Sequence, residues 1–326
     1  MTRALAMISG GLDSTLAAKL IMNQGIDVIG ICFKSYFFGP KNAEKMTKQI
    51  SIPLVVVDFS KEHLKMVRNP KHGYGKNMNP CIDCHAMMMS YSGRLLEEYG
   101  ADFIITGEVL NQRPMSQNKA ALDVVRKESG YTDKILRPLC ALNLDPTKME
   151  LEGIVEREKL VKISGRSRKV QMELAEKWGI VDYPSPAGGC KLTDPNFSKR
   201  LHDLLELDKS PSEEAINLLK FGRHMRISKN AKIISTRNGD EEQEIKKYLK
   251  EAELIFFTKE YNGSMIIITG NPGAEDIDFA ARVARRYSKG KNQEDVVVTY
   301  GRYGHPSEKS VIAVPAGDSE IEQYMI

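Results

Sequence analysis

Short apolar runs alternate with segments of helical periodicity along the first third of the chain. Apolar runs of this length are typical of strands that are buried on both faces of a parallel sheet. The expected strands are residues 3–9, 26–33, 53–60 and 101–109, and the expected helices are residues 13–25, 42–52 and 87–100. This alternation predicts an α/β fold with a doubly wound, mostly parallel sheet. Ligands of such sheets bind beyond the carboxyl ends of the strands.

The pattern changes twice farther along the chain. Residues 144–180 read as a helix, a basic turn and a second helix, and a loop rich in Pro and Gly follows. Beyond residues 208–214, short strand-like runs surround two helix-like segments, which predicts a separate, smaller α+β domain. The expected divisions are residues 1–145 for the α/β domain, 146–207 for the helical segment and the loop that complete its site, and 208–326 for the second domain.

Composition is that of an ordinary globular protein, with 41% hydrophobic and 28% charged residues among 326 positions. No apolar run approaches the roughly 20 residues that span a bilayer, so a cytoplasmic protein without membrane contact is expected. The formal net charge of +4 permits an acidic partner such as RNA without requiring one. Five cysteines without an export signal do not indicate a disulfide framework, and Cys32 and Cys140, which have apolar neighbours, are expected in the core.

A glycine-rich turn, SGGLDST at residues 9–15, joins the first expected strand to the first expected helix. Glycine lets the backbone adopt left-handed angles, and successive amides at a helix N-terminus bind anions. The G-K-[ST] ending of a Walker A loop is absent. The carboxylate of Asp13 would repel phosphate, so it is expected either to cap the helix or to bind a neutralising Mg²⁺. The residues expected to contact phosphate are Ser9, Gly10, Gly11, Asp13, Ser14 and Thr15.

Two further segments are expected to contact ligand. Thr106 and Gly107 end the fourth strand at the ligand edge of the sheet and suit a close approach to a nucleotide, whereas Glu108 is expected to be solvated. The segment that follows and the turn ISGRSRK at residues 163–169 offer cations to a phosphate backbone. The expected RNA contacts are Arg113, Arg166, Arg168 and Lys169.

Three cysteines lie in two loops rich in Gly and Pro. Cys81 and Cys84 form a Cys-x-x-Cys in a long loop, residues 69–85, and Cys190 lies far along the chain. Long loops in compact domains are usually functional. Three chemistries fit these residues. They are structural zinc with His85 or another residue as fourth ligand, a redox or persulfide pair, and an iron–sulfur cluster held by three thiolates.

The motifs SGGLDST, NPCIDCH, TGEVLNQRPMSQ and YPSPAGGCKLTDP follow the order seen in tRNA thiouridylases, and the first matches the S-G-G-x-D-S pattern of PP-loop ATP pyrophosphatases. The N-terminal part of the chain therefore resembles the MnmA/TrmU-like branch of that superfamily, which has a PP-loop/HUP-like fold. One departure is Cys81-x-x-Cys84, where bacterial members of the branch commonly have Asp-x-x-Cys. It makes the chain similar to tRNA thiolases that hold a [4Fe-4S] cluster with a CxxC and a distant cysteine.

This resemblance implies an ATP-dependent tRNA sulfurtransferase that adenylates a pyrimidine carbonyl, above all that of uridine, and replaces its oxygen with sulfur. The implied cofactors are ATP, Mg²⁺ and a [4Fe-4S] cluster, with zinc as the alternative metal. The implied partners are tRNA and a sulfur donor, either sulfide or a sulfur-carrier protein, and a homodimer is compatible with the sequence. The implied catalytic residues are Asp13 and the metal-binding Cys81, Cys84 and Cys190.

The C-terminal domain loosely resembles the RNA-binding domain of the NFACT group, through LKFGRHMRI, AKIISTRNGDEEQEIKKY and VVVTYGRYG. Basic residues beside aromatic ones suit RNA, and a small dimerisation or packing domain is the other interpretation. Two other functions stay open for the whole chain. One is a PP-loop enzyme acting on a small molecule, such as a deazaguanine nitrile synthase or a sulfur-inserting enzyme. The other is a non-catalytic RNA-binding protein, which the intact Gly-Gly-x-Asp-Ser disfavours.

Overall fold

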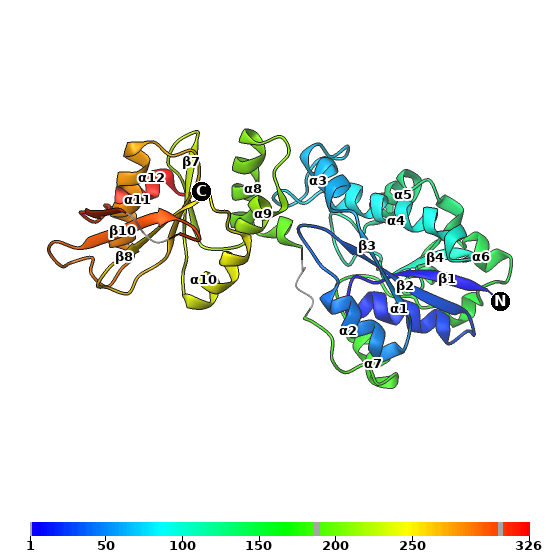
Figure 1. Ribbon diagram of the computed structural model, residues 1–326. Helices are drawn as coiled ribbons and strands as arrows, with labels where there is room; N and C mark the ends of the chain where they lie inside the picture. Colours follow the sequence, from blue (N-terminus) through cyan, green and yellow to red (C-terminus); the bar gives the residue numbers. More distant parts are fainter. Residues whose placement is uncertain (1, 186–189, 306–308) are drawn as a thin grey trace. The chain divides into compact units, whose positions relative to one another are not determined.

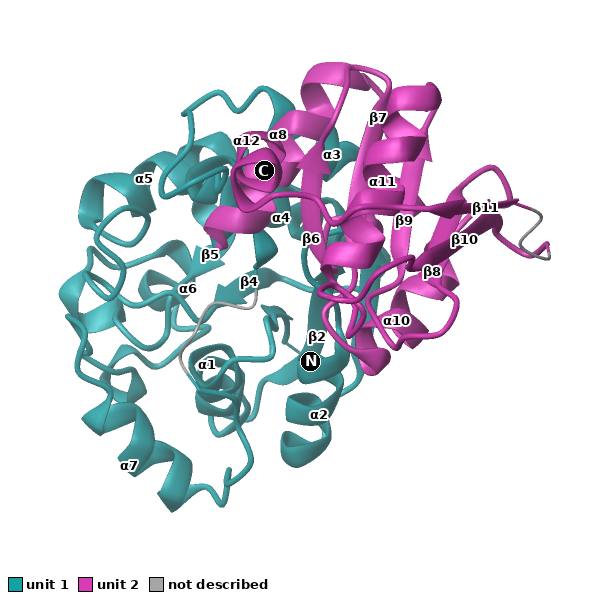
Figure 2. Cartoon of the chain, turned by 90° about the vertical axis from the view of Figure 1, so that its left-hand side faces the viewer, with its two compact units in different colours: residues 1–193 teal, residues 194–326 magenta. Residues whose placement is uncertain are grey.

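The computed structural model describes residues 2–185, 190–305 and 309–326 (Figure 1). The chain divides into two compact units, residues 1–193 and residues 194–326 (Figure 2). Among the described residues, no helix has both the length and the apolar character that a membrane crossing requires.

Unit 1 is built on a parallel sheet. Its strands are β1 (Arg3–Met7), β2 (Asp27–Lys34), β3 (Leu54–Asp58), β4 (Phe103–Thr106) and β5 (Ile135–Leu136). Neighbouring strands run parallel in the order β3-β2-β1-β4-β5. β1, β2 and β4 are rich in buried apolar side chains because helices cover both faces of the sheet. The expected doubly wound α/β fold is confirmed.

The helices of unit 1 lie on the two faces of this sheet (Figure 1). They are α1 (Leu12–Met22), α2 (Lys41–Ile50), α3 (Ser60–Arg68), α4 (Cys81–Glu98), α5 (Lys119–Glu128), α6 (Lys148–Leu151) and α7 (Lys169–Lys177). Leu16 of α1 and Met46 of α2 belong to one buried core, and Met89 of α4 and Val125 of α5 belong to another. Successive residues of β1 alternate between these two cores, as the pleat of a strand requires.

Two segments of unit 1 differ from the expected elements. The Cys-x-x-Cys lies in the first turn of α4 rather than in a loop, because the Cys84 amide donates to the Pro80 carbonyl at 2.9 Å and Asp83 puts a carboxylate at the positive end of the helix. The first helix expected in residues 144–180 is reduced to α6, since Gly153 follows it with a φ of +70°. Helices α3 and α5 were not predicted.

Unit 2 is an antiparallel sheet with helices on both faces, which confirms the expected α+β domain. Its strands are β6 (Arg223–Arg226), β7 (Ala231–Ser235), β8 (Leu254–Thr258), β9 (Ile266–Gly270), β10 (Val297–Arg302) and β11 (Lys309–Ile312), in the order β11-β10-β8-β9-β7-β6. Its helices are α8 (Pro195–Leu207), α9 (Glu213–Leu218), α10 (Gly239–Ile245), α11 (Ala274–Arg286) and α12 (Asp318–Tyr324). On β7, Ile233 packs in the core under α11, and Ile234 packs in the core under α9 and α10.

Helix α8 belongs to unit 2, so the units divide before this helix rather than after it, where the sequence suggested a boundary. The buried Arg200 donates from two guanidinium nitrogens to the carbonyls of Leu219 and Gly222, at 3.0 and 3.1 Å. Asp203 forms a two-point ion pair with Arg226 of β6, at 2.8 and 2.6 Å. The change of composition that suggested a later boundary is the short link between α8 and α9.

We expect the fragment 194–326 to unfold cooperatively and the fragment 208–326, which lacks α8, to be markedly less stable. Removing α8 leaves Arg226 without its carboxylate and the carbonyls of Leu219 and Gly222 without the hydrogen bonds from Arg200. Urea unfolding followed by circular dichroism compares the two fragments. Equal stability would contradict the assignment of α8 to unit 2.

Candidate active site

The glycine-rich turn between β1 and α1 is shaped by a close backbone contact. Gly10 has a φ of +82°, and a Cβ added there would lie 2.5 Å from the Cβ of Asn42 and 2.6 Å from the backbone nitrogen of Ala43, both in α2. Only glycine combines that angle with that space. Gly11 is the N-cap of α1 and offers no side chain to its first amides. The turn therefore leads into a helix N-terminus whose first amides have no side-chain cap from Gly11, the arrangement that binds anions.

Asp13 does not cap α1, which corrects one of its two expected roles. It lies in the first turn of α1, where one carboxylate oxygen accepts a hydrogen bond from Gln112 at 3.0 Å. Its other oxygen is buried and has no hydrogen-bond partner in the described part of the chain. The hydroxyls of Ser14 and Thr15 donate to the Gly11 carbonyl at 3.0 and 3.1 Å. Asp13 thus has one buried carboxylate oxygen beside the turn that no described residue hydrogen-bonds.

The end of β4 is packed directly against this turn. A Cβ added at Gly107 would lie 2.4 Å from the backbone nitrogen of Ser14, so the two backbones touch. The hydroxyl of Thr106 is buried and donates to Glu108 at 3.2 Å. Gly107 therefore serves a close approach between chain segments, and it brings the residues after β4 to the edge of the phosphate turn.

Glu108 is buried, not solvated as expected, and is 5% exposed. Its carboxylate accepts hydrogen bonds from the Nε of Arg137 and the Nδ1 of His85, each at 2.8 Å. Burial alone would raise the pKa of this carboxyl, but Arg137 and His85 outweigh burial and lower the pKa to about 2. Because His85 follows Cys84 in α4, this ionised carboxylate ties the end of β4 to the thiol-bearing helix.

The three cysteines of the two loops come together here. Cys81 and Cys84 lie in the first turn of α4, and Cys190 is held nearby because the Lys191 amide donates to the Phe37 carbonyl at 3.2 Å. Burial, and then the charges of Cys190 and Cys81, raise the pKa of Cys84 well above its usual value. Burial, with a contribution from Cys81, raises the pKa of Cys190 to about 11. Charge effects of this kind act between neighbouring groups, and all three residues are free thiols.

Arg113 is exposed, and its charge acts on two of these thiols. Burial raises the pKa of Cys81 and Cys190, and the Arg113 guanidinium partly offsets that rise in both. The preceding residue, Gln112, donates to Asp13 in the phosphate turn. The loop after β4 thus connects the two halves of the site, the anion-binding turn and the thiol group.

His63 belongs to this site and was missed by the sequence analysis. Its Nε2 lies 3.2 Å from the Sγ of Cys84, and its Nδ1 lies 2.9 Å from the Oγ of Ser35, which directly follows β2. The ring is fully buried, and burial lowers the pKa of His63 to about 4. In the sequence, His63 reads as an ordinary residue of an amphipathic segment, and nothing local links it to a cysteine.

Metal ligation was expected of the three thiols. In residues 2–185, 190–305 and 309–326, no three His, Cys, Asp or Glu side chains form a group with the spacing of a metal site. A charge acts over distances longer than a metal–sulfur bond of about 2.3 Å, so thiols that affect one another's pKa need not be spaced as the ligands of one metal ion. Cys32 and Cys140 are buried in the core as expected.

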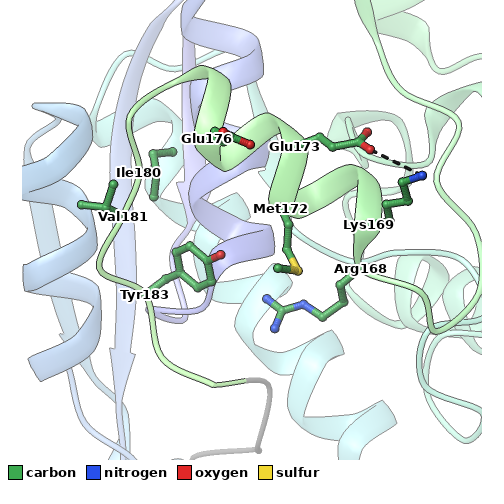
Figure 3. Close-up of a pocket in the computed structure, with 8 residues that line it drawn as sticks. All are labelled: Arg168, Lys169, Met172, Glu173, Glu176, Ile180, Val181 and Tyr183. Atoms are coloured by element: carbon green, nitrogen blue, oxygen red, sulfur yellow. Dashed lines mark ion pairs between the residues drawn. The ribbon is translucent and has the colours of Figure 1, made fainter.

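The basic turn lies at the same edge of the sheet. The Gly165 amide donates to the Leu110 carbonyl at 2.8 Å, which ties the turn to the segment after β4. Arg168 is the N-cap of α7 and Lys169 is its first residue, and both line a pocket of about 610 Å³ that Tyr183 also lines (Figure 3). The Nε of Arg168 is buried without a hydrogen-bond partner in the described residues. Lys169 forms an ion pair with Glu173 at 4.0 Å, which the dashed line in Figure 3 marks.

Comparison with known protein families divides the chain in a similar way. A family described as thiamine biosynthesis protein (ThiI) matches residues 1–151, and the NFACT protein RNA binding domain matches residues 222–325. The first match covers β1 to β5 together with the phosphate turn and the Cys-x-x-Cys. The second lies entirely within unit 2, and it agrees with the resemblance seen in the sequence.

Individual relatives match only part of the chain. The tRNA-specific 2-thiouridylase MnmA of Bartonella quintana is 28% identical over 152 residues, 40% of this chain and 37% of its own length. The probable tRNA sulfurtransferase of Thermococcus kodakarensis is 29% identical over 153 residues, 43% of this chain and 38% of its own length. A 4-thiouridine synthetase in complex with RNA and ATP covers 55% of this chain and 52% of its own, at 17% identity and a TM-score of 0.36. The chain thus spans less than two fifths of the length of these two curated relatives.

We expect Gly10→Ala to abolish nucleotide binding and to destabilise unit 1, because the new Cβ would meet the backbone of α2. Gly25→Ala is the matched control, since Gly25 also has a positive φ, +78°, but has open space around its Cβ position. Its cost should be the roughly 1–2 kcal/mol of a left-handed residue alone. Calorimetric titration with ATP and thermal unfolding measure both effects. Equal behaviour of the two variants would contradict the steric argument.

Proposed function

We propose that this chain, which joins a ThiI-family domain to an NFACT-type RNA-binding domain, is an ATP-dependent tRNA sulfurtransferase. One observation carries the proposal. Gly107 packs against the anion-binding turn, and the adjacent Glu108 is hydrogen-bonded to His85, the chain neighbour of the thiol-bearing Cys84. A site that activates a base with ATP and a site that supplies sulfur to the same base must be adjacent in this way.

ATP would bind with its phosphates at the turn of residues 9–11 and the first amides of α1. The buried, unpartnered carboxylate oxygen of Asp13 fits a Mg²⁺ ion that neutralises those phosphates, since Mg²⁺ prefers carboxylate and phosphate oxygens. Gln112 would keep that carboxylate in place through its hydrogen bond to the other oxygen. Asp13 is thus proposed as a ligand of Mg²⁺.

The reaction would proceed in two displacements. The carbonyl oxygen of a pyrimidine, above all uridine, attacks the α-phosphorus of ATP, and pyrophosphate leaves. Sulfide then attacks the activated ring carbon, a carbon–sulfur bond forms, and the carbon–oxygen bond breaks as AMP departs. The protein contributes mainly by positioning the base and by stabilising charge on the phosphates. Arg113, which lies beside both the thiols and Gln112, is well placed to attract an anionic sulfur donor.

A metal centre held by Cys81, Cys84 and Cys190 is part of this proposal. Burial raises the pKa of all three thiols, and the charge of Cys81 adds to the rise in Cys84 and Cys190, so three bare thiolates would be unfavourable here and a bound cation would relieve that cost. A [4Fe-4S] cluster accepts three thiolate ligands and, when bound, supplies an open iron that can hold sulfur. Zinc is the alternative and would need a fourth ligand.

RNA contacts are proposed at two places. Arg166, Arg168 and Lys169 would contact the phosphate backbone, and Tyr183, which lines the same pocket as Arg168 and Lys169, would offer a ring for stacking (Figure 3). Unit 2 would hold the body of the tRNA, in keeping with its match to an RNA-binding domain. The target base must leave its stack to reach the thiols.

A second candidate is sulfur transfer to a small molecule, which the description of the matching family as a thiamine biosynthesis protein favours. The two functions differ in what ATP turnover requires. A tRNA enzyme should release AMP and pyrophosphate only when tRNA is present, whereas an enzyme of the second kind should do so without RNA. The tRNA proposal is wrong if turnover is unchanged by removing RNA.

We expect Cys190→Ala to abolish formation of thiolated nucleosides while leaving ATP affinity at the wild-type level. The protein is reconstituted anaerobically with iron and sulfide and is incubated with ATP, sulfide and bulk tRNA, and the digested nucleosides are analysed by mass spectrometry. Cys32→Ala is the control, because Cys32 is a buried core thiol that has no role in the proposed reaction. Thiolation that survives in Cys190→Ala would overturn the proposed role of this residue.

We expect Arg166→Gln and Arg168→Gln to weaken tRNA binding and to reduce its salt dependence by about one unit of slope for each lost phosphate contact. Lys177→Gln, at the exposed far end of α7, is the matched control for loss of one positive charge. Filter binding across a range of salt concentrations measures both quantities. If all three variants bind tRNA alike, the basic turn does not contact the backbone.

A further inference from the structure

His63 connects the end of β2 to one of the three thiols. Its Nε2 lies 3.2 Å from the Sγ of Cys84, and its Nδ1 lies 2.9 Å from the Oγ of Ser35. The three side chains are almost fully removed from solvent. Each ring nitrogen therefore has one neighbour, and the direction of each hydrogen bond depends on which nitrogen carries the proton.

The hydroxyl hydrogen of Ser35 determines which nitrogen of His63 carries the proton. The Phe37 amide already donates to the Oγ of Ser35 at 3.2 Å, so this oxygen has one incoming hydrogen bond. If the Nδ1 of His63 also donated to it, the hydroxyl hydrogen of Ser35 would be buried without an acceptor in the described residues. If instead Ser35 donates to Nδ1, then Nε2 carries the proton and points it at Cys84. Only the second arrangement satisfies the hydroxyl, which is a stronger donor than a thiol.

Packing keeps the ring in this orientation. Phe59 stacks on the imidazole with centroids 4.8 Å apart and an interplanar angle of 23°. Phe37 and Phe38 contact it at centroid distances of 5.6 and 5.4 Å. These apolar neighbours favour the neutral imidazole and leave it little freedom to turn. The N–H bond is thus aimed at one sulfur.

We propose that His63 is a positioning residue whose Nε2–H donates to the sulfur of Cys84 and holds that sulfur as a thiolate ligand, with Ser35 fixing the tautomer. This inference rests on the proposed function in so far as Cys84 ligates a metal centre. Hydrogen bonds to ligand sulfurs raise the reduction potential of iron–sulfur clusters and strengthen metal binding. A rival role, His63 as the fourth ligand of a zinc site, needs an unprotonated Nε2 and hence the opposite tautomer.

The tautomer can be read in the reduced, metal-free full-length protein by long-range ¹H–¹⁵N correlation spectra of ¹⁵N-histidine-labelled chain. His63→Gln identifies the signals of this ring. We expect a neutral ring with the proton on Nε2, and we expect Ser35→Ala to disturb that preference. A proton on Nδ1 would overturn the proposal. This readout requires neither a cluster nor activity, so it stays informative even if the proposed function is wrong.

The reduction potential of the reconstituted cluster provides the second readout. We expect His63→Leu to shift it to a more negative value and to bind Zn²⁺, used alone as a probe in competition with a chelator, about 10-fold more weakly. Phe38→Leu is the structural control, because it loosens packing on the same ring and keeps the N–H donor. Its potential should stay at the wild-type value. Equal shifts in both variants, or no shift in His63→Leu, would show that His63 acts through packing alone.

Discussion

The buried carboxylate of Glu108 is the constraint on which the candidate site depends. It pairs with Arg137 after β5 and with His85 on the thiol-bearing helix, and it directly follows Gly107, which packs against the helix of the phosphate turn. An ionised carboxylate at this depth is stable only while it is paired, and breaking such a pair costs about 3–5 kcal/mol. The ends of β4 and β5 and the start of α4 are therefore held in one arrangement.

This arrangement explains why the residues of the candidate site lie at one edge of the parallel sheet. The carboxyl ends of parallel strands bring together the phosphate turn after β1, Ser35 after β2 and Glu108 after β4. Burial raises the pKa of the three thiols, which favours their protonated form. The proposed metal centre would therefore release protons when it forms, and its binding would strengthen as pH rises. Unit 2 is similar to an RNA-binding domain, and the proposed tRNA substrate, much larger than the pocket, would need such a second surface.

Much of the fold could be predicted from local patterns in the sequence. The alternation of apolar runs and helical segments predicted the parallel sheet, and SGG at the first strand–helix junction predicted a tight turn, which Gly10 forms with its φ of +82°. The predictions that failed concern residues whose environment depends on contacts between distant segments of the chain. Glu108 looked solvated because nothing near it in the sequence indicates Arg137, and His63 gave no signal because its partners follow other strands. The start of α4 was missed because its N-cap, Pro80, makes no side-chain capping hydrogen bond, so the segment lacks the usual sequence signal of a helix start.

The central claim is that ATP activates the same base atom that sulfur replaces. It is tested most directly with tRNA whose uracil carbonyl oxygens carry ¹⁸O, incubated with reconstituted protein, ATP and sulfide. The account predicts one ¹⁸O atom in AMP for each thiolated nucleoside formed, because the carbonyl oxygen attacks the α-phosphorus and leaves with it. Thiolated tRNA accompanied by unlabelled AMP would contradict the account.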